Sequence, residues 1–215
     1  MLTVHDLEPH IEREFGSRLE PLGFQRLGQR RWIRTHKLPI RELFTIGALK
    51  GGRYCPSWGI SIGVVPSFRA QSFRRQSTDK NAIMDLVIDP IDTTGVVPPE
   101  AFGFISGLNT EIPVRQIRIC AEHFLRLALA DFERVTTIAD FCKFFLERSR
   151  LQYRRFLFDM YTQHQLVSGF VYLLTGERAE GLERIRGFCV RMGADYQDRV
   201  LLDCIRHAET LRTTA

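Results

Sequence analysis

The sequence predicts an α+β protein, in which an N-terminal helix packs on an antiparallel sheet and an all-helical bundle or array follows. Three patterns support this fold class. Apolar residues recur at helical spacing up to Leu22, and a period of two replaces that spacing between Arg41 and Pro66. Helical spacing then returns from Glu111 to the end of the chain. A helix followed by strands with short links is typical of a sheet covered on one face.

The first element is a helix that runs to about Leu22. Asp6 is the predicted N-cap, and Gly23 is suited to the left-handed residue that follows a helix end. The predicted apolar stripe consists of Leu7, Ile11, Phe15, Leu19 and Leu22.

Strands come next. One is expected over Arg30–Arg34, and two more within Arg41–Pro66, joined by a loop over Lys50–Arg53. The last of these strands has two unlike faces, because strand side chains alternate. One face carries Trp58, Ile60, Ile62 and Val64, and the other carries Gly59, Ser61 and Gly63.

The next three segments are less regular. Ser67–Asp79 is polar and rich in Arg, which predicts a surface loop or an irregular edge. Asn81–Asp89 fits either a short helix or a strand, and we favour the helix. Pro90–Thr110 includes Gly95, Pro98, Pro99 and Gly103, residues that break helices and strands, and it is expected to link two halves.

The remainder is predicted to be helical. Apolar stripes start near Val114, Ile138 and Tyr153, a further helix covers Ala179–Met192, and a last one contains Leu201. We therefore expect an α+β domain over residues 1–108 and a helical domain over 109–215 packed against it.

Composition is that of an ordinary globular protein, with 44% hydrophobic and 26% charged residues. No apolar run is long enough to span a bilayer, and the N-terminus lacks a signal-peptide pattern, so we expect a cytoplasmic protein without membrane contact. The net charge of +5 is mildly basic and comes mostly from Arg. The five cysteines lack metal-binding spacing, which predicts buried thiols at four positions and a loop thiol at Cys55.

The densest polar patch lies between residues 74 and 92 and offers one possible chemistry. If its second half is helical, Asp85 and Asp89 lie four apart on one face, where two carboxylates can hold a divalent cation or act as an acid–base pair. The favoured alternative is structural: Thr78 or Asp79 caps the helix, and Asp89 ends it before Pro90. The other members of the patch are Arg74, Arg75, Thr78, Lys80 and Asp92.

Other reactive signatures are missing from the sequence. His residues show no zinc spacing, and neither a nucleophile elbow nor a phosphate loop occurs, so we expect no metal and no cofactor.

Arg clusters offer a second chemistry, because guanidinium groups interleaved with aromatic rings suit phosphate contact and base stacking. The favoured alternative is that they pair with acidic residues of the same chain. The clusters are Arg30, Arg31 and Arg34 around Trp32; Arg69, Arg74 and Arg75 near Phe68 and Phe73; and Arg148, Arg150, Arg154 and Arg155 near Tyr153.

Two segments of the chain resemble known protein families. Val167–Phe188 resembles one tetratricopeptide unit, through Gly169, Tyr172, Gly176 and Gly181, although Phe188 departs from the pattern and no second copy occurs. The first hundred residues resemble a bacterial family of uncharacterised α+β proteins, a domain of unknown function. That second likeness rests on the segments Leu19–Arg34, Tyr54–Pro66 and Ser77–Asp92. It implies a fold and a bacterial origin, and it brings no reaction.

The function predicted from the sequence is non-catalytic binding of a macromolecule, with another protein as the expected partner. Adaptor, regulator and toxin-neutralising roles all fit this prediction. One alternative is nucleic-acid binding through the Arg clusters, and a second is a metal-dependent enzyme that uses Asp85 and Asp89. The oligomeric state is left open by the sequence.

Overall fold

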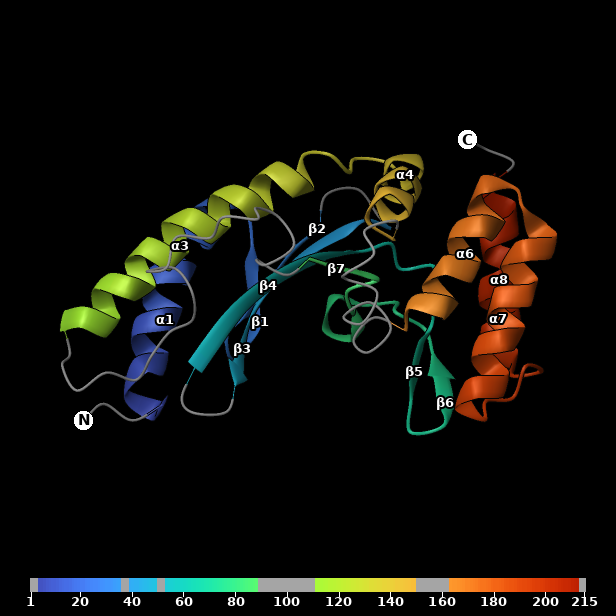
Figure 1. Cartoon of the computed structure of the whole chain (residues 1–215), viewed down its shortest axis with the longest axis horizontal. Helices are drawn as coiled ribbons and strands as arrows, with labels where there is room; N and C mark the ends of the chain where they lie inside the picture. Colours follow the sequence, from blue (N-terminus) through green and yellow to red (C-terminus); the bar gives the residue numbers. More distant parts are fainter. Residues whose placement is uncertain (1–3, 36–38, 50–52, 89–110, 150–162, 213–215) are drawn as a thin grey trace. The chain divides into compact units, whose positions relative to one another are not determined.

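The computed structural model describes residues 4–35, 39–49, 53–88, 111–149 and 163–212 (Figure 1). It has the predicted α+β architecture: an N-terminal helix, an antiparallel five-stranded sheet and then several helices. The sheet has the order β1-β2-β3-β4-β7, with strands Gln25–Gly28, Arg31–Thr35, Arg41–Leu49, Arg53–Ser61 and Leu86–Ile88. The described helices are α1 (Val4–Leu19), α3 (Glu111–Phe132), α4 (Ile138–Ser149), α6 (His164–Thr175), α7 (Arg178–Met192) and α8 (Arg199–Arg212).

The chain forms two compact units, each assembled from separate segments. Unit 1 comprises the described residues of 1–35, 42–59 and 88–133, and unit 2 those of 36–41, 60–87 and 134–215. The link expected over 90–110, with the domain boundary inside it, lies outside the described residues, as does the predicted helix start at Tyr153.

In unit 1, α1 buries the stripe that the sequence predicts, since Leu7, Ile11, Phe15 and Leu19 are at most 1% exposed. Leu22 is the exception at 41%, because α1 ends at Leu19 and a 3-10 turn follows it. Gly23 then takes the predicted left-handed conformation, with φ of 87°. The helix begins at Val4, so Asp6 lies in its first turn and the predicted N-cap at Asp6 is wrong.

The core of unit 1 is a row of aromatic rings. Phe15 contacts Phe44 of β3 at 5.5 Å between ring centroids, and Phe44 stacks on Trp58 of β4 at 6.4 Å. Trp58 in turn contacts Phe124 of α3 at 6.4 Å, and its Nε1 donates a hydrogen bond to Asp131 at 2.9 Å. Both α1 and α3 therefore pack on the sheet face that carries Phe44 and Trp58.

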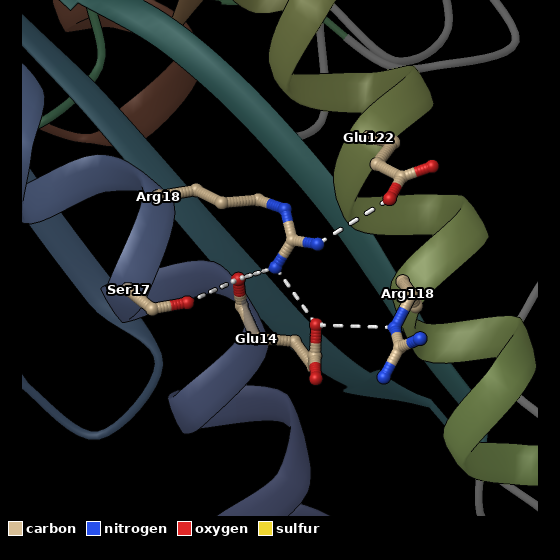
Figure 2. A network of polar contacts seen from close by, with 5 residues as sticks. All are labelled: Glu14, Ser17, Arg18, Arg118 and Glu122. Carbon is tan, nitrogen blue, oxygen red and sulfur yellow. Dashed lines mark hydrogen bonds and ion pairs between the residues drawn. The ribbon is translucent and has the colours of Figure 1, made fainter.

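Ion pairs join α1 and α3 at the surface of unit 1 (Figure 2). Arg18 pairs with Glu14 at 2.7 Å and reaches Glu122 at 3.4 Å, while Arg118 lies 3.9 Å from Glu14. Exposed pairs of this kind contribute little free energy, so the buried rings hold these two helices to the sheet.

In unit 2, α6 and α7 form the helical hairpin that the sequence predicts, with Gly176 between them at φ of 99°. The two helices touch where Gly169 and Gly181 face each other. A Cβ added to Gly169 would lie 2.6 Å from Cγ1 of Ile185 and 2.9 Å from the carbonyl oxygen of Gly181. The helix backbones can approach this closely because glycine lacks a side chain.

Three local predictions are wrong. Ser67–Asp79 is not a loop throughout, because it contains a hairpin of β5 (Ser67–Arg69) and β6 (Ser72–Arg74). The described part of the segment predicted as a helix over Asn81–Asp89 is not α-helical: Asn81 ends a 3-10 turn, and Leu86–Ile88 form strand β7, with Leu86 and Ile88 buried on one face. Cys55 lies within β4 and is half-buried.

We expect Gly169→Ala to destabilise unit 2 by about 1–3 kcal/mol, because the new methyl group has no space between α6 and α7. The matched control is Gly187→Ala in α7, where the added Cβ meets only the end of the Gln165 side chain at 2.7 Å. That side chain can rotate away, and alanine favours helix, so the control should be neutral or stabilising by up to about 1 kcal/mol. Urea denaturation followed by circular dichroism measures both, and equal effects would contradict the close contact.

Candidate functional site

Asp85, one of the predicted site residues, lies inside a group of hydrogen-bonded polar side chains. It precedes β7 and has no exposed surface. Its backbone N–H donates to the carbonyl of Ile60 at 2.9 Å, and its Oδ2 accepts the N–H of Ile62 at 2.8 Å. This pairing with the end of β4 outweighs the local helical pattern, which explains why the segment is extended.

Gln76 connects Asp85 to the rest of this site. Its Nε2 donates to Oδ1 of Asp85 at 3.0 Å and to the carbonyl of Val65 at 2.8 Å. Its Oε1 accepts hydrogen bonds from the hydroxyl of Ser61 at 3.0 Å and from the N–H of Ile83 at 2.8 Å. The side-chain amide of Gln76 therefore makes four hydrogen bonds while it is 1% exposed.

Arg41 completes the network from the start of β3. Its side chain is 4% exposed, its Nε pairs with Asp79 at 2.8 Å, and it donates to the carbonyl of Gln76 at 3.2 Å. Gly63, at φ of 65°, leaves room for the guanidinium group, because a Cβ there would lie 2.8 Å from it. We call Arg41, Ser61, Gln76, Asp79 and Asp85 the buried polar network.

The ionisation of Asp85 is strongly perturbed. Burial raises its pKa from 3.8 to about 7, against the opposing effect of the hydrogen bonds from Ile62, Gln76 and Ser61 and of the charge on Arg41. Because both oxygens already accept N–H groups and no surface is exposed, Asp85 has no access to a substrate. The helical spacing behind an Asp85–Asp89 pair is absent, and Asp89 and Asp92 lie outside the described residues.

The structural alternative for this segment, a helix capped by Thr78 or Asp79, is also wrong. Thr78 and Asp79 do not cap a helix: Thr78 precedes a single 3-10 turn, Asp79–Asn81, without a capping hydrogen bond, and Asp79 instead binds Arg41. Lys80 is exposed within that turn.

The first Arg cluster is mostly engaged inside unit 1. Arg30 pairs with Glu8 at 2.7 Å and lies over the ring of Tyr54. Arg34 pairs with the buried Glu42 at 2.6 Å. Trp32 is 0% exposed and belongs to the core, so its ring is not accessible for base stacking, while Arg31 is half-buried.

The second cluster is divided. Arg75 pairs with Asp203 of α8 at 2.8 Å, whereas Arg69 and Arg74 are exposed on the β5–β6 hairpin. From the third cluster, Arg148 lies over the ring of Phe144, and Arg150, Arg154 and Arg155 lie outside the described residues. The described members of the clusters therefore contact separate partners: Glu8 and Glu42 in unit 1, and Asp203 and Phe144 in unit 2.

The remaining candidates are structural. Burial raises the pKa of Cys120 and Cys142 to about 12, which keeps these thiols protonated, and Cys189 and Cys204 are also buried. His123 has a lowered pKa because of burial and the nearby Arg126, and His164 stacks on Phe145 at 5.3 Å.

Metal-binding clusters and membrane-spanning helices are both absent from the described residues. Among them, no three His, Cys, Asp or Glu side chains are grouped so that they could hold a metal ion. None of the helices seen in these segments has both the length and the apolar character needed to cross a membrane.

No protein-family model, curated protein or solved structure matches the chain. The likeness of the first hundred residues to a bacterial family therefore stays a prediction, as does the likeness of α6 and α7 to a tetratricopeptide unit.

Sequence reasoning missed Gln76 and Arg41, the two residues that organise the buried polar network. The one available signal was the small-residue face Gly59, Ser61 and Gly63, which predicts that another element approaches β4 closely. Gln76 binds Ser61, and the guanidinium of Arg41 lies against Gly63. The small-residue face therefore borders the network, although the sequence did not indicate that Gln76 and Arg41 would pack there.

The buried polar network predicts that stability falls as the pH rises from about 4 to about 7, by up to about 4 kcal/mol. The folded chain binds the Asp85 proton more tightly than the unfolded chain does. Protonation therefore stabilises the fold at low pH, and this stabilisation is lost as the pH rises through the pKa of Asp85 in the folded chain. Asp85→Asn should remove this pH dependence, while Asp79→Asn, at a half-exposed carboxylate, should keep it. Urea denaturation at about pH 5 and about pH 8 measures it.

An NMR titration of the Asp85 carboxyl carbon in the unaltered protein checks the same point without a variant. A midpoint near 7 is expected. A midpoint near the ordinary value of 3.8, or an Asp85→Asn variant with the original pH dependence, would contradict it.

Proposed function

We propose that this chain is a non-catalytic protein-binding protein whose contact surface is the C-terminal end of α7. We call this surface the α7-end patch, and it consists of Arg186, Val190 and Tyr196. The observation that carries the proposal is the exposure of an apolar side chain there: Val190 is 85% exposed, and Met192 at the end of the same helix is 40% exposed.

The patch has further features of an interface. Val190 follows Arg186 by one helical turn, so their side chains are neighbours on α7. The guanidinium of Arg186 lies 5.2 Å from the ring centroid of Tyr196, which holds both groups at the surface beside Val190. Tyr, Arg and Met are enriched at protein interfaces, where a partly apolar centre is bordered by polar groups.

The helix end that carries the patch is fixed in place. Phe188 and Cys189 of α7 are buried, and Gly193 ends the helix with φ of 63°. The N–H of Ala194 then donates to the carbonyl of Cys189 at 2.8 Å, which fixes the turn that leads to Tyr196. A rigid surface loses less entropy on binding.

The charges around the patch indicate the chemistry of the partner. Arg186 and Arg191 are both exposed next to Val190. A protein that presents an apolar pocket bordered by carboxylates would complement them. The burial of Asp85 supports this function over a metal-dependent enzyme, and the burial of Trp32 removes the aromatic ring of the first Arg cluster from nucleic-acid binding.

The test places a photo-crosslinking phenylalanine analogue at position 190, or at position 22 as a control, in cells of the source organism. Leu22 is the matched control because it is also an exposed apolar residue near a helix end, at 41%. The proposal predicts one protein crosslinked from position 190 and not from position 22. That protein, once purified, should bind the chain directly.

Binding to the purified partner then measures the patch itself. Val190→Asp should weaken the Kd by at least about tenfold, because the carboxylate loses its hydration in an apolar pocket and is repelled by the carboxylates that border that pocket. Leu22→Asp should leave it unchanged. Equal crosslinking from both positions, or a partner whose affinity is insensitive to Val190→Asp, would overturn the proposal.

A further inference from the structure

The β5–β6 hairpin of unit 2 has two chemically distinct faces. Its strands pair antiparallel, with Phe68 opposite Phe73. These two rings are 7% and 4% exposed and pack on Phe188 of α7, at 5.6 and 6.3 Å between centroids. Because side chains alternate along a strand, the flanking residues point to the other face. That outer face presents Arg69, Ser72 and Arg74, whereas Ser67 is 6% exposed and its hydroxyl donates to the carbonyl of Arg74 at 3.4 Å.

The hairpin is held to the helices at several points besides its rings. The side-chain amide of Gln163, just before α6, donates to the carbonyl of Phe68 at 2.7 Å and accepts its N–H at 3.2 Å. Arg75 pairs with Asp203 of α8 at 2.8 Å. These contacts hold the hairpin, and with it the outer face, in a fixed position in unit 2. The hairpin can be followed beside α6, α7 and α8 in Figure 1.

The turn at the tip reinforces this arrangement. Ala70 and Gln71 both have positive φ, at 49° and 60°, which matches a two-residue hairpin turn in spite of the absence of glycine. Non-glycine residues in this conformation are strained, so the surrounding contacts must hold the turn in place.

The outer face is cationic. Arg69 and Arg74 are exposed, and their guanidinium groups pair with no carboxylate among the described residues. In the observed register they occupy diagonal positions, Arg69 being opposite Ser72 and Arg74 opposite Ser67. Diagonal side chains on an antiparallel pair start about 7–8 Å apart, so both can contact one extended anion.

We propose that the outer face of the β5–β6 hairpin binds the phosphate backbone of nucleic acid. Guanidinium and hydroxyl groups are the side chains that contact phosphates, and a two-stranded ribbon fits the major groove of a duplex. The face carries no apolar side chain, so it lacks the anchor that a protein interface requires. Contacts to phosphates carry no sequence information, so this binding is independent of sequence. This site is separate from the α7-end patch and does not depend on the proposed protein partner.

The experiment titrates labelled duplex DNA with the full chain at increasing salt and follows fluorescence anisotropy. Arg69→Glu/Arg74→Glu should weaken binding at least about tenfold and lower the slope of log K against log salt by about 2, because two phosphate contacts are lost. The matched control is Arg13→Glu/Arg115→Glu, which makes the same charge change at exposed positions of unit 1. It should keep the original slope.

One further variant tests whether charge alone is sufficient, and one further probe tests whether the face prefers nucleic acid to an acidic protein. Arg69→Lys/Arg74→Lys keeps the charge and should retain most of the affinity, and unchanged thermal melting shows that each variant is folded. A poly-glutamate peptide serves as the acidic-protein probe. The proposal is overturned if the unaltered chain does not bind DNA at low salt, if both charge-reversal variants lose equal affinity, or if poly-glutamate binds as tightly through the same arginines.

Discussion

The carboxyl group of Asp85 has no exposed surface and is held between the end of β4 and the side-chain amide of Gln76. This contact fixes the part of unit 2 between β4 and β7. A buried polar group that loses its partner costs about 1–3 kcal/mol, so each member of the network depends on the others. Gln76 alone satisfies the N–H of Ile83 and the carbonyl of Val65. The segment between β6 and β7 is thereby fixed without regular secondary structure of its own beyond one turn.

Burial removes two residues with reactive side chains, Asp85 and Arg41, from the candidates for a functional site. Asp85 and Arg41 have the residue types of a catalytic or ion-binding site, yet both are nearly inaccessible and hydrogen-bonded within the fold. The groups left for binding are therefore at the surface, on α7 and on the β5–β6 hairpin. The two surfaces differ in chemistry: Val190 and Tyr196 offer apolar area, whereas Arg69 and Arg74 offer only charge and hydroxyl neighbours.

The parts of the fold that could be predicted are those with a long periodic signal. The α1 stripe repeats over many residues, and tertiary packing agrees with it. The alternation predicted from Trp58 to Val64 holds only to Ser61, where β4 ends, because Gly63 has φ of 65°. By contrast, β7 has three residues, and its sequence fits two periods equally well, so only its pairing beside β4 decides its conformation. The hairpin was missed because its turn, Ala70–Gln71, lacks glycine; the repeated Ser-Phe-Arg on either side of it was the available signal. Gln76 could not be predicted, since its four partners come from segments that only the fold brings together.

The central claim is that the buried polar network holds unit 2 together, and amide hydrogen exchange tests it most directly. The N–H groups of Ile62 and Ile83 donate to Asp85 and Gln76, so they should exchange only when unit 2 unfolds, as slowly as the most protected amides of α6 and α7. The exposed turn residue Ala70 supplies the fast reference in the same spectrum. Exchange of Ile62 and Ile83 at the rate of Ala70 would contradict the claim.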